Sequence, residues 1–300
     1  MKNKNVIVII GPTASGKSDL SIQVAKKLNG EVISADSSQV YVGLDIGSAK
    51  IKKEEMQSIK HYMIDIKQAN EDFCVAEFKE LALKNIQDIL SKNKTPIICG
   101  GTGLYVRALI DDYDFDFTPK SEELRAKIEK EIEENGIDFA YQMLKSLSES
   151  KASKINPNDK VRIVRALEKE LCEKQTTKQL ENDFNYFVYV IDMDRTLLYQ
   201  RINDRVDKMV EIGLFDEVKK LMEKGITTKN SCFKSIGYKE VYDYYANGTL
   251  DKQQTIELIK KKTRNYAKRQ LTFFRGIKQA VWLRSNDKLS ELLQDYNKKA

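Results

Sequence analysis

The sequence predicts an α/β fold in which helices flank a mostly parallel sheet, with a helical insertion domain in addition. Apolar runs of strand length alternate with amphipathic, helix-favouring stretches in the first and last parts of the chain, as in proteins built from β-loop-α units. A charged stretch from residue 121 to about residue 178 interrupts this alternation and holds no strand candidate. These two observations separate a sheet-based core from an inserted helical segment.

The first part of the core shows the strand-helix order most clearly. Residues 6–10 read VIVII, a β-branched run typical of a strand that is buried on both faces, and helical spacing follows at 18–28. The same order then returns, with strands predicted at 31–34, 62–66 and 96–99 and an amphipathic helix at 75–91. We expect these strands to share one mostly parallel sheet.

The insertion begins near DDYDFDFTPK, residues 111–120, whose composition is that of an exposed connector. The strand signal returns at 187–191, and a long basic helix is predicted from about residue 252 to residue 274. The predicted domains are therefore a core in two parts, residues 1–112 and 186–300, around a helical insertion at 113–185.

Composition excludes several classes of site. His61 is the single histidine, which argues against a Ser-His-Asp triad or a His-rich zinc site. The four cysteines are too widely spaced for a CxxC motif or a disulfide framework; they are Cys74, Cys99, Cys172 and Cys232. No apolar run is long enough to cross a bilayer, so we expect a cytoplasmic protein with no membrane partner.

Basic residues gather near the C-terminus. Residues 251–280 hold nine Lys or Arg against two Asp or Glu, whereas residues 121–150 hold eight acidic against four basic residues. The whole chain carries a formal net charge of only +6. Such uneven placement is typical of a polyanion-binding surface, although solvated helix faces also carry charge runs.

Between the first strand and its helix, residues 11–18 read GPTASGKS. They match G-x-x-x-x-G-K-[ST] in the strand-loop-helix context that a P-loop requires. Gly11 and Gly16 let successive backbone N–H groups point at phosphate oxygens. Lys17 supplies an ammonium group and Ser18 a hydroxyl ligand for Mg²⁺. The sequence therefore predicts a P-loop core that binds a phosphate chain.

The usual arrangement for nucleotide hydrolysis is not evident. P-loop enzymes that transfer a phosphoryl group hold Mg²⁺ with an acid after a hydrophobic strand, but strand 96–99 runs into Gly100-Gly101-Thr102. Asp65, in the predicted strand 62–66, is a candidate acid near the metal. A strand-end Asp is more often only a turn residue or helix cap.

Polar residues also follow two further strands. Asp36-Ser37-Ser38-Gln39 comes after strand 31–34, and Thr102 after strand 96–99. Because ligands of parallel sheets bind outside the carboxyl ends of the strands, we expect these residues to share one cleft with the P-loop. Asp36 is then a candidate general base rather than a turn residue, and Gln39 has the donor and acceptor needed to read an adenine edge.

Longer motifs resemble one family, the tRNA dimethylallyltransferases, over nearly the whole chain. They occur in that family's order and read GPTASGKS, ISADSSQVYVGLDIGSAK, HYMIDI, GGTGLYVRAL, NPNDKVRIVRALE, RINDRVDKMV, SIGYKE and TRNYAKRQLTFFR. Two departures are mild, since Ser48 stands where the family often has Thr and Phe273 where it often has Trp.

The resemblance implies transfer of a dimethylallyl group from dimethylallyl diphosphate to the exocyclic amine (N6) of an adenosine beside the tRNA anticodon. Diphosphate leaves, so the P-loop stabilises a leaving group. The implied catalytic residues are Asp36 as general base, Lys17, Thr102 and Arg205, with Arg201 as second choice for the arginine. The implied diphosphate site, with Mg²⁺ on Ser18, is Gly11, Pro12, Thr13, Ala14, Ser15, Gly16, Lys17 and Ser18.

The same resemblance, together with the basic helix, implies a tRNA anticodon-loop partner whose target base is extruded into the cleft. Cations interleaved with aromatics on that helix suit phosphate contact and base stacking, although Phe residues docked in the core are the plainer interpretation. The predicted tRNA contacts are Asp36, Ser37, Ser38, Gln39, Thr102, Arg125, Val161, Arg162, Arg165, Lys234, Lys239, Lys268, Arg269, Gln270, Phe274 and Arg275. We expect a monomer.

Three alternatives stay open at this point. A small-molecule or nucleotide kinase would share the fold, the loop and Mg²⁺, but would leave the basic aromatic helix unused. An adenylate isopentenyltransferase would prenylate free nucleotides instead of tRNA. A nucleotide-gated RNA-binding module would make Asp36 and Thr102 incidental.

Overall fold

The computed structural model describes residues 4–111, 121–172 and 182–300. The chain divides into two compact units, one formed by Met1–Tyr113 with Leu180–Ala300 and the other by Asp114–Gln179. The first unit contains the sheet and the phosphate loop, and the second is helical. Each unit is described separately below.

The first unit is built on a parallel sheet whose described strands lie in the order β3-β2-β4-β1-β5-β6. Every neighbouring pair is parallel. The strands are β1 (Asn5–Ile10), β2 (Gly30–Ala35), β3 (His61–Tyr62), β4 (Thr95–Gly100), β5 (Asn185–Ile191) and β6 (Val281–Leu283). The mostly parallel sheet predicted from the sequence is confirmed.

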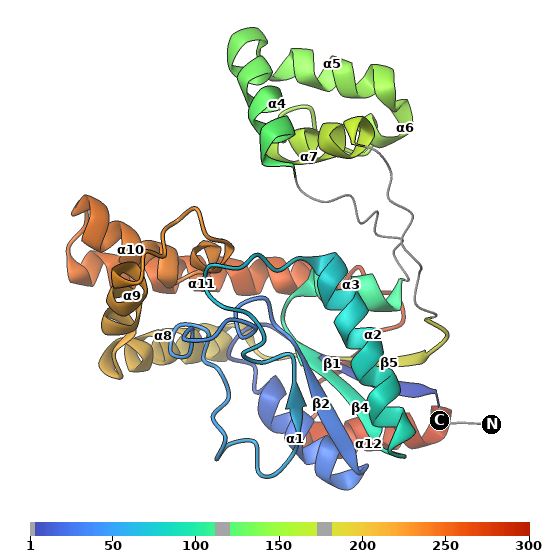
Figure 1. The fold of residues 1–300 in the computed structure, drawn as a ribbon. Helices are drawn as coiled ribbons and strands as arrows, with labels where there is room; N and C mark the ends of the chain where they lie inside the picture. The colour runs from blue at the N-terminus through green and yellow to red at the C-terminus, as the bar shows by residue number, and fades with distance from the viewer. Residues whose placement is uncertain (1–3, 112–120, 173–181) are drawn as a thin grey trace. The chain divides into compact units, whose positions relative to one another are not determined.

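Alternation along the strands divides their side chains between two apolar layers. Val6, Val8 and Ile10 of β1 pack on one face, whereas Ile7 and Ile9 pack on the other. The first face is covered by α2 (Val75–Ser91) and α3 (Gly103–Ile110), and the second by α1 (Lys17–Lys27) and α12 (Lys288–Lys299). Figure 1 shows this sandwich of helices around the sheet.

The remaining helices of the first unit lie together beside the sheet in Figure 1. They are α8 (Arg195–Glu211), α9 (Leu214–Glu223), a short 3₁₀ helix at Ser231–Lys234, α10 (Tyr238–Asn247) and α11 (Lys252–Phe274). Helix α11 is capped by Asp251, whose side chain accepts from the backbone N–H of Gln254. The helix predicted from about residue 252 to residue 274 is therefore confirmed.

The second unit is made of α4 (Glu122–Asn135), α5 (Ile137–Leu147), α6 (Glu149–Ala152) and α7 (Lys160–Leu171). Its own apolar core includes Leu144, Ile163 and Leu167, none of them exposed. Beside this core, the fully buried Glu168 carboxylate accepts hydrogen bonds from two arginines and from the backbone N–H of Ser121. The described residues of this unit contain helices and no strand.

Two local predictions were wrong or incomplete. The strand predicted at 62–66 ends at Tyr62, because Met63 and Asp65 have φ of 65° and 53°, which strands do not accommodate. The edge strand β6 was missed, since three residues carry too little periodicity to be recognised. Among the described residues, no helix is long and apolar enough to cross a membrane.

Candidate active site

A cavity of about 410 Å³ lies at the carboxyl ends of β1, β2 and β4. Its polar lining includes Lys17 and Ser18 of the phosphate loop, Asp36 and Gln39 after β2, and Arg205 of α8. The strand ends thus meet in one cleft, as parallel topology requires. Every one of these side chains belongs to the first unit.

Local geometry and one distant side chain shape the phosphate loop. Gly16 has φ of 85° and is the N-cap of α1, a left-handed conformation that glycine adopts without strain. Gln270 of α11 accepts from the backbone N–H of Thr13 at 2.9 Å and donates to the carbonyl of Gly101 at 2.8 Å. One buried amide therefore ties the loop after β1 to the loop after β4.

The cationic side chains of the cavity lie within each other's field. Burial lowers the pKa of the Lys17 ammonium, and the nearby Arg205 guanidinium also lowers it, whereas Asp36 raises it. Burial likewise lowers the pKa of Arg205, against the opposing effect of Asp36. A bound anion would relieve this repulsion between two partly desolvated cations, so the site is built for a strongly charged ligand.

Asp36 lines the cavity and uses only one of its carboxylate oxygens to form a turn. Its Oδ1 accepts from the backbone N–H groups of Ser38, at 2.8 Å, and Gln39, at 3.3 Å. No hydrogen bond reaches its Oδ2 from the described residues. The turn and the candidate base are therefore compatible, because the two roles use different oxygens.

The side-chain amide of Gln39 is oriented from both ends. Its Oε1 accepts from the Ser34 hydroxyl at 3.1 Å, and its Nε2 donates to the Ala49 carbonyl at 3.4 Å. An amide has two donor hydrogens and two acceptor lone pairs. One of each is left for a ligand, which is the pair that an adenine edge requires.

Thr102 acts beside the cavity, which it does not line. Its hydroxyl accepts from the backbone N–H of Ser37 at 3.1 Å, and its own N–H donates to the Ala35 carbonyl. In this structure Thr102 therefore holds the segment that carries Asp36.

The two candidate arginines separate clearly. Arg205 lines the cavity and donates to the Ser48 carbonyl at 3.4 Å, whereas Arg201, one turn earlier on α8, is exposed and lies outside the cavity lining. The geometry therefore favours Arg205. Asp65, a candidate acid near the metal, pairs instead with Lys50 and does not line the cavity, so that prediction is wrong.

Apolar side chains line part of the same cavity. Helix α8 contributes Ile202, Val206 and Met209 from the face that also carries Arg205, and α11 contributes Ile259. Residues three or four apart share one helix face. The cavity can therefore hold a molecule with a charged end and a hydrocarbon end.

Comparison with known proteins agrees with this chemistry. The family model described as IPP transferase matches residues 39–277. A tRNA dimethylallyltransferase from Acetivibrio thermocellus is 45% identical over 290 residues, covering 94% of this chain and 92% of that protein. This chain belongs to the IPP transferase family. The resemblance to tRNA dimethylallyltransferases inferred from its motifs is confirmed, and with it the assignment as an enzyme of that class.

Solved structures of IPP transferase relatives share the whole fold. The tRNA isopentenylpyrophosphate transferase of Bacillus halodurans is 39% identical with a TM-score of 0.73, covering 98% of this chain and 95% of that one. The Staphylococcus epidermidis counterpart is 40% identical with a TM-score of 0.73, covering 99% and 100%. A eukaryotic dimethylallyltransferase acting on tRNA is 29% identical with a TM-score of 0.80, covering 98% and 78%.

The tRNA contacts predicted in the first unit of this family member differ in their exposure and in whether they line the cavity. Ser37 and Ser38 line the cavity with Asp36, as does Lys234. Four further side chains are exposed, namely Lys239, Lys268, Arg269 and Arg275, and of these Arg269 also lines the cavity. Phe274 is fully buried in the core and Gln270 is only 5% exposed. The prediction of RNA contact is wrong for Phe274, because its ring packs inside, and Gln270 instead supports the phosphate loop.

In the second unit, two of the predicted tRNA contacts are exposed and two are engaged in ion pairs. Val161 and Arg162 are exposed on α7. Arg125 and Arg165 both donate to Glu168, at 2.9 Å and 2.6 Å, and each is about one-third exposed. Although burial alone would raise the pKa of Glu168, these two arginines lower it. Both arginines therefore stabilise the helical unit.

The sequence interpretation missed two parts of this IPP transferase site. Tyr266 of α11 lines the cavity, and burial together with nearby Asp36 raises its pKa to about 12. Gly47, Ser48 and Ala49 also line it. The motif DIGSAK, which contains these three residues, was recognised without a role, and only the tertiary contacts reveal one.

Proposed function

We propose that this IPP transferase moves a dimethylallyl group from dimethylallyl diphosphate to N6 of an adenosine beside the anticodon of tRNA. The observation that carries the proposal is one cavity with a phosphate loop, a strand-end carboxylate and an apolar wall. A kinase needs no hydrocarbon pocket beside the phosphates. Relatives of this chain include a tRNA dimethylallyltransferase and a eukaryotic dimethylallyltransferase acting on tRNA, which supports the same substrate class.

The reaction breaks the allylic carbon–oxygen bond, and its electron pair leaves with diphosphate. Lys17 and Arg205 lie where negative charge develops, and their partial desolvation makes each cation more effective there. Because the charge on the bridging oxygen grows as the bond breaks, these groups stabilise the transition state more than the bound substrate. Attack occurs at carbon, and the phosphorus atoms keep all their oxygens.

The adenine N6 forms the new carbon–nitrogen bond and loses one proton. We assign that proton to Asp36, which lines the cavity and whose Oδ2 accepts no hydrogen bond from the described residues. Thr102 acts as a positioning residue for this carboxylate through Ser37. Gln39 would recognise the adenine edge with its remaining donor and acceptor.

The donor set also fits Mg²⁺. No group of three His, Cys, Asp or Glu side chains that could cage a metal occurs among the described residues. Mg²⁺ commonly takes few protein ligands and keeps substrate phosphate oxygens and waters. The Ser18 hydroxyl, exposed in the cavity lining, would be its protein ligand. When bound, the metal would supply positive charge to the diphosphate.

Exposed cations beside the cavity would hold the RNA backbone. Lys234 lies in the lining, and Lys268, Arg269 and Arg275 are exposed on or just after α11. Phosphate contacts of this kind position an RNA without reading its sequence. Val161 and Arg162 of the second unit are proposed as further contacts. The proposal also includes a monomeric enzyme and a cytoplasmic location.

The test offers purified protein three substrate pairs. One reaction contains labelled dimethylallyl diphosphate with unmodified tRNA, a second contains the same labelled diphosphate with free nucleotides, and a third contains ATP with free nucleotides. We expect label in tRNA and none in free nucleotides. ADP formation without label transfer would instead identify a kinase, and label in free nucleotides an adenylate isopentenyltransferase.

An Asp36→Asn variant makes the test specific, because an amide oxygen can still accept the turn hydrogen bonds but cannot take a proton. We expect turnover to fall by about 10²–10⁴-fold, the usual contribution of a general base, while tRNA binding persists. The matched control is Asp204→Asn, an exposed position on α8, which should leave turnover unchanged. Loss of tRNA prenylation in both variants would contradict the assignment.

A further inference from the structure

Residues 45–49, here called the DIGSA loop, contribute Gly47, Ser48 and Ala49 to the cavity wall and contact Arg205, the arginine that we propose for catalysis. The Ser48 carbonyl of this loop accepts from Arg205 Nη2 at 3.4 Å. The next carbonyl, that of Ala49, accepts from Gln39. The contact with Ser48 therefore joins the backbone of the DIGSA loop to the guanidinium of Arg205, which sits on a different element.

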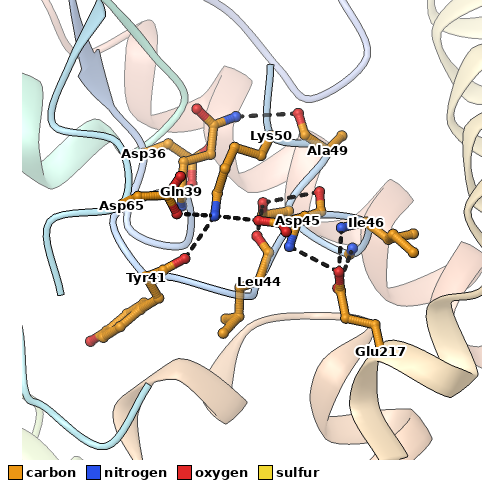
Figure 2. A network of polar contacts seen from close by, with 12 residues as sticks. Asp36, Gln39, Tyr41, Leu44, Asp45, Ile46, Ala49, Lys50, Asp65 and Glu217 are labelled. Carbon is orange, nitrogen blue, oxygen red and sulfur yellow. Dashed lines mark hydrogen bonds and ion pairs between the residues drawn. The ribbon is translucent and has the colours of Figure 1, made fainter. Parts of the chain in front are cut away.

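One side chain, Glu217 of α9, holds that backbone. Its Oε2 accepts from the N–H groups of Asp45 at 3.0 Å and Ile46 at 2.8 Å, and its Oε1 accepts from that of Gly47 at 3.1 Å. Oε1 also accepts from the Tyr238 hydroxyl at 2.6 Å. Figure 2 shows the Glu217 carboxylate against the consecutive amides of the loop.

The surroundings leave the DIGSA loop little freedom. A Cβ atom added to Gly47 would lie 2.5 Å from Cε2 of Tyr238, whose ring is fully buried. Beyond the loop, the Lys50 ammonium lies between the carboxylates of Asp45 and Asp65 and donates to the Tyr41 carbonyl at 2.8 Å. The start of the loop, at Asp45, is therefore held both by the Glu217 carboxylate and by the Lys50 ammonium.

We propose that Glu217 is a positioning residue for catalysis, which acts through the DIGSA loop to direct the Arg205 guanidinium at the diphosphate. Glu217 does not line the cavity, so it does not touch the substrates. The inference rests on the proposed function for its kinetic part. Its structural part, the anchoring of Asp45–Gly47 by this carboxylate, stands on the hydrogen bonds alone.

The hydrogen bonds of Glu217 suggest a substitution that changes an acceptor into a donor at nearly constant size. All four of its partners are donors, and a carboxylate has only acceptors to offer them. In Glu217→Gln one oxygen becomes an NH₂ group of nearly the same size, which turns at least one of these contacts into a meeting of two donors. The variant therefore weakens the anchor without opening a cavity.

Hydrogen exchange tests directly whether Glu217 anchors the backbone of the DIGSA loop. In Glu217→Gln we expect the amides of residues 45–47 to exchange at least about tenfold faster, which corresponds to about 1.4 kcal/mol of lost protection. The matched control is Glu223→Gln, an exposed glutamate on the same helix, which should leave these amides unchanged. Unchanged exchange in Glu217→Gln would overturn the proposal.

Kinetic measurements test whether Glu217 affects catalysis through Arg205. We expect Glu217→Gln to lower the turnover number about tenfold in the wild-type background and less than about threefold in an Arg205→Lys background, because contacts in one network are not additive. The same loss in both backgrounds would show a role unrelated to Arg205 and overturn the proposal. If the wild-type protein prenylates no tRNA, the proposed function fails, and the exchange comparison still decides whether Glu217 anchors the loop.

Discussion

The cavity is bounded by two loops that reach their conformations by different routes. Residues 11–18 lie between β1 and α1, with glycine at the left-handed position and the lysine and serine at the start of the helix. The DIGSA loop instead depends on Glu217, about 170 residues away in the sequence. The first conformation is encoded mostly by neighbouring residues, with one distant contact from Gln270, whereas the second is held by a side chain from a distant helix.

This difference predicts two kinds of failure after substitution. Changes in the phosphate loop remove charge or donors at the leaving group and should lower the rate without lowering stability. Changes around the DIGSA loop disturb packing and hydrogen bonding, so they should lower stability and rate together. The following experiments test that separation, from the largest expected effect to the smallest.

Lys17→Ala should have the largest effect on rate. Loss of one charged group at the departing diphosphate costs about 2.7–4 kcal/mol, or about 10²–10³-fold in turnover, by analogy with oxyanion-stabilising groups. Single-turnover assays with labelled prenyl diphosphate measure it, alongside thermal unfolding. Lys27→Ala, an exposed position at the other end of α1, is the control. A large loss of stability in Lys17→Ala would remove the distinction between the two loops.

Gly47→Ala should lower stability and rate together. Its Cβ would meet the buried Tyr238 ring at 2.5 Å, and overpacking of this kind costs about 1–3 kcal/mol. Chemical denaturation measures the free energy of unfolding. The cost should shrink in a Tyr238→Leu background, where the ring is absent. An equal cost in both backgrounds would mean that the ring is not the source.

The pH dependence of diphosphate binding should reveal the lowered pKa of Lys17. Burial lowers the pKa of Lys17 below its ordinary 10.5, so the folded protein loses this proton at lower pH than the unfolded chain. Between the lowered pKa and 10.5, stability should rise with pH while diphosphate affinity falls. Titration calorimetry with inorganic diphosphate measures the affinity. In Lys17→Arg the alkaline loss should disappear, and its persistence there would exclude Lys17 as the cause.

Tyr238→Phe should have the smallest effect. It removes one of the four hydrogen bonds to Glu217 and leaves the three backbone amides in place. A typical hydrogen bond contributes about 0.5–1.5 kcal/mol, so stability should fall by that amount and turnover by less than about threefold. A loss of rate as large as that of Lys17→Ala would show that the hydroxyl, rather than the amides, controls the loop.

Particular residues show where sequence interpretation of the site succeeded. Lys17, Ser18, Asp36 and Gln39 meet in one cavity because each follows directly on a parallel strand or its loop, and strand order alone brings such ends together. Arg205 was placed by resemblance, and the structure supports it over Arg201. For Asp36, the turn and the proposed base role are compatible, because the turn uses only Oδ1.

Other residues show why the rest could not be predicted. The same pattern of cations and aromatics on α11 contains exposed Lys268, buried Phe274 and the bridging Gln270. A helical pattern gives a periodicity, but which face meets the core is decided by the partner surface. Asp65 was predicted as a strand-end acid, but it forms an ion pair with Lys50 and does not line the cavity.

The sequence by itself determined the parallel α/β core, the phosphate loop, the inserted helices and the family. These features follow from short-range periodicity and from motifs whose residues are neighbours along the chain. Only the tertiary structure decided which arginine faces the cavity, which helix face is buried, and that Glu217 holds the DIGSA loop. Such contacts join residues far apart in sequence, and their geometry is fixed by packing, which no local pattern records.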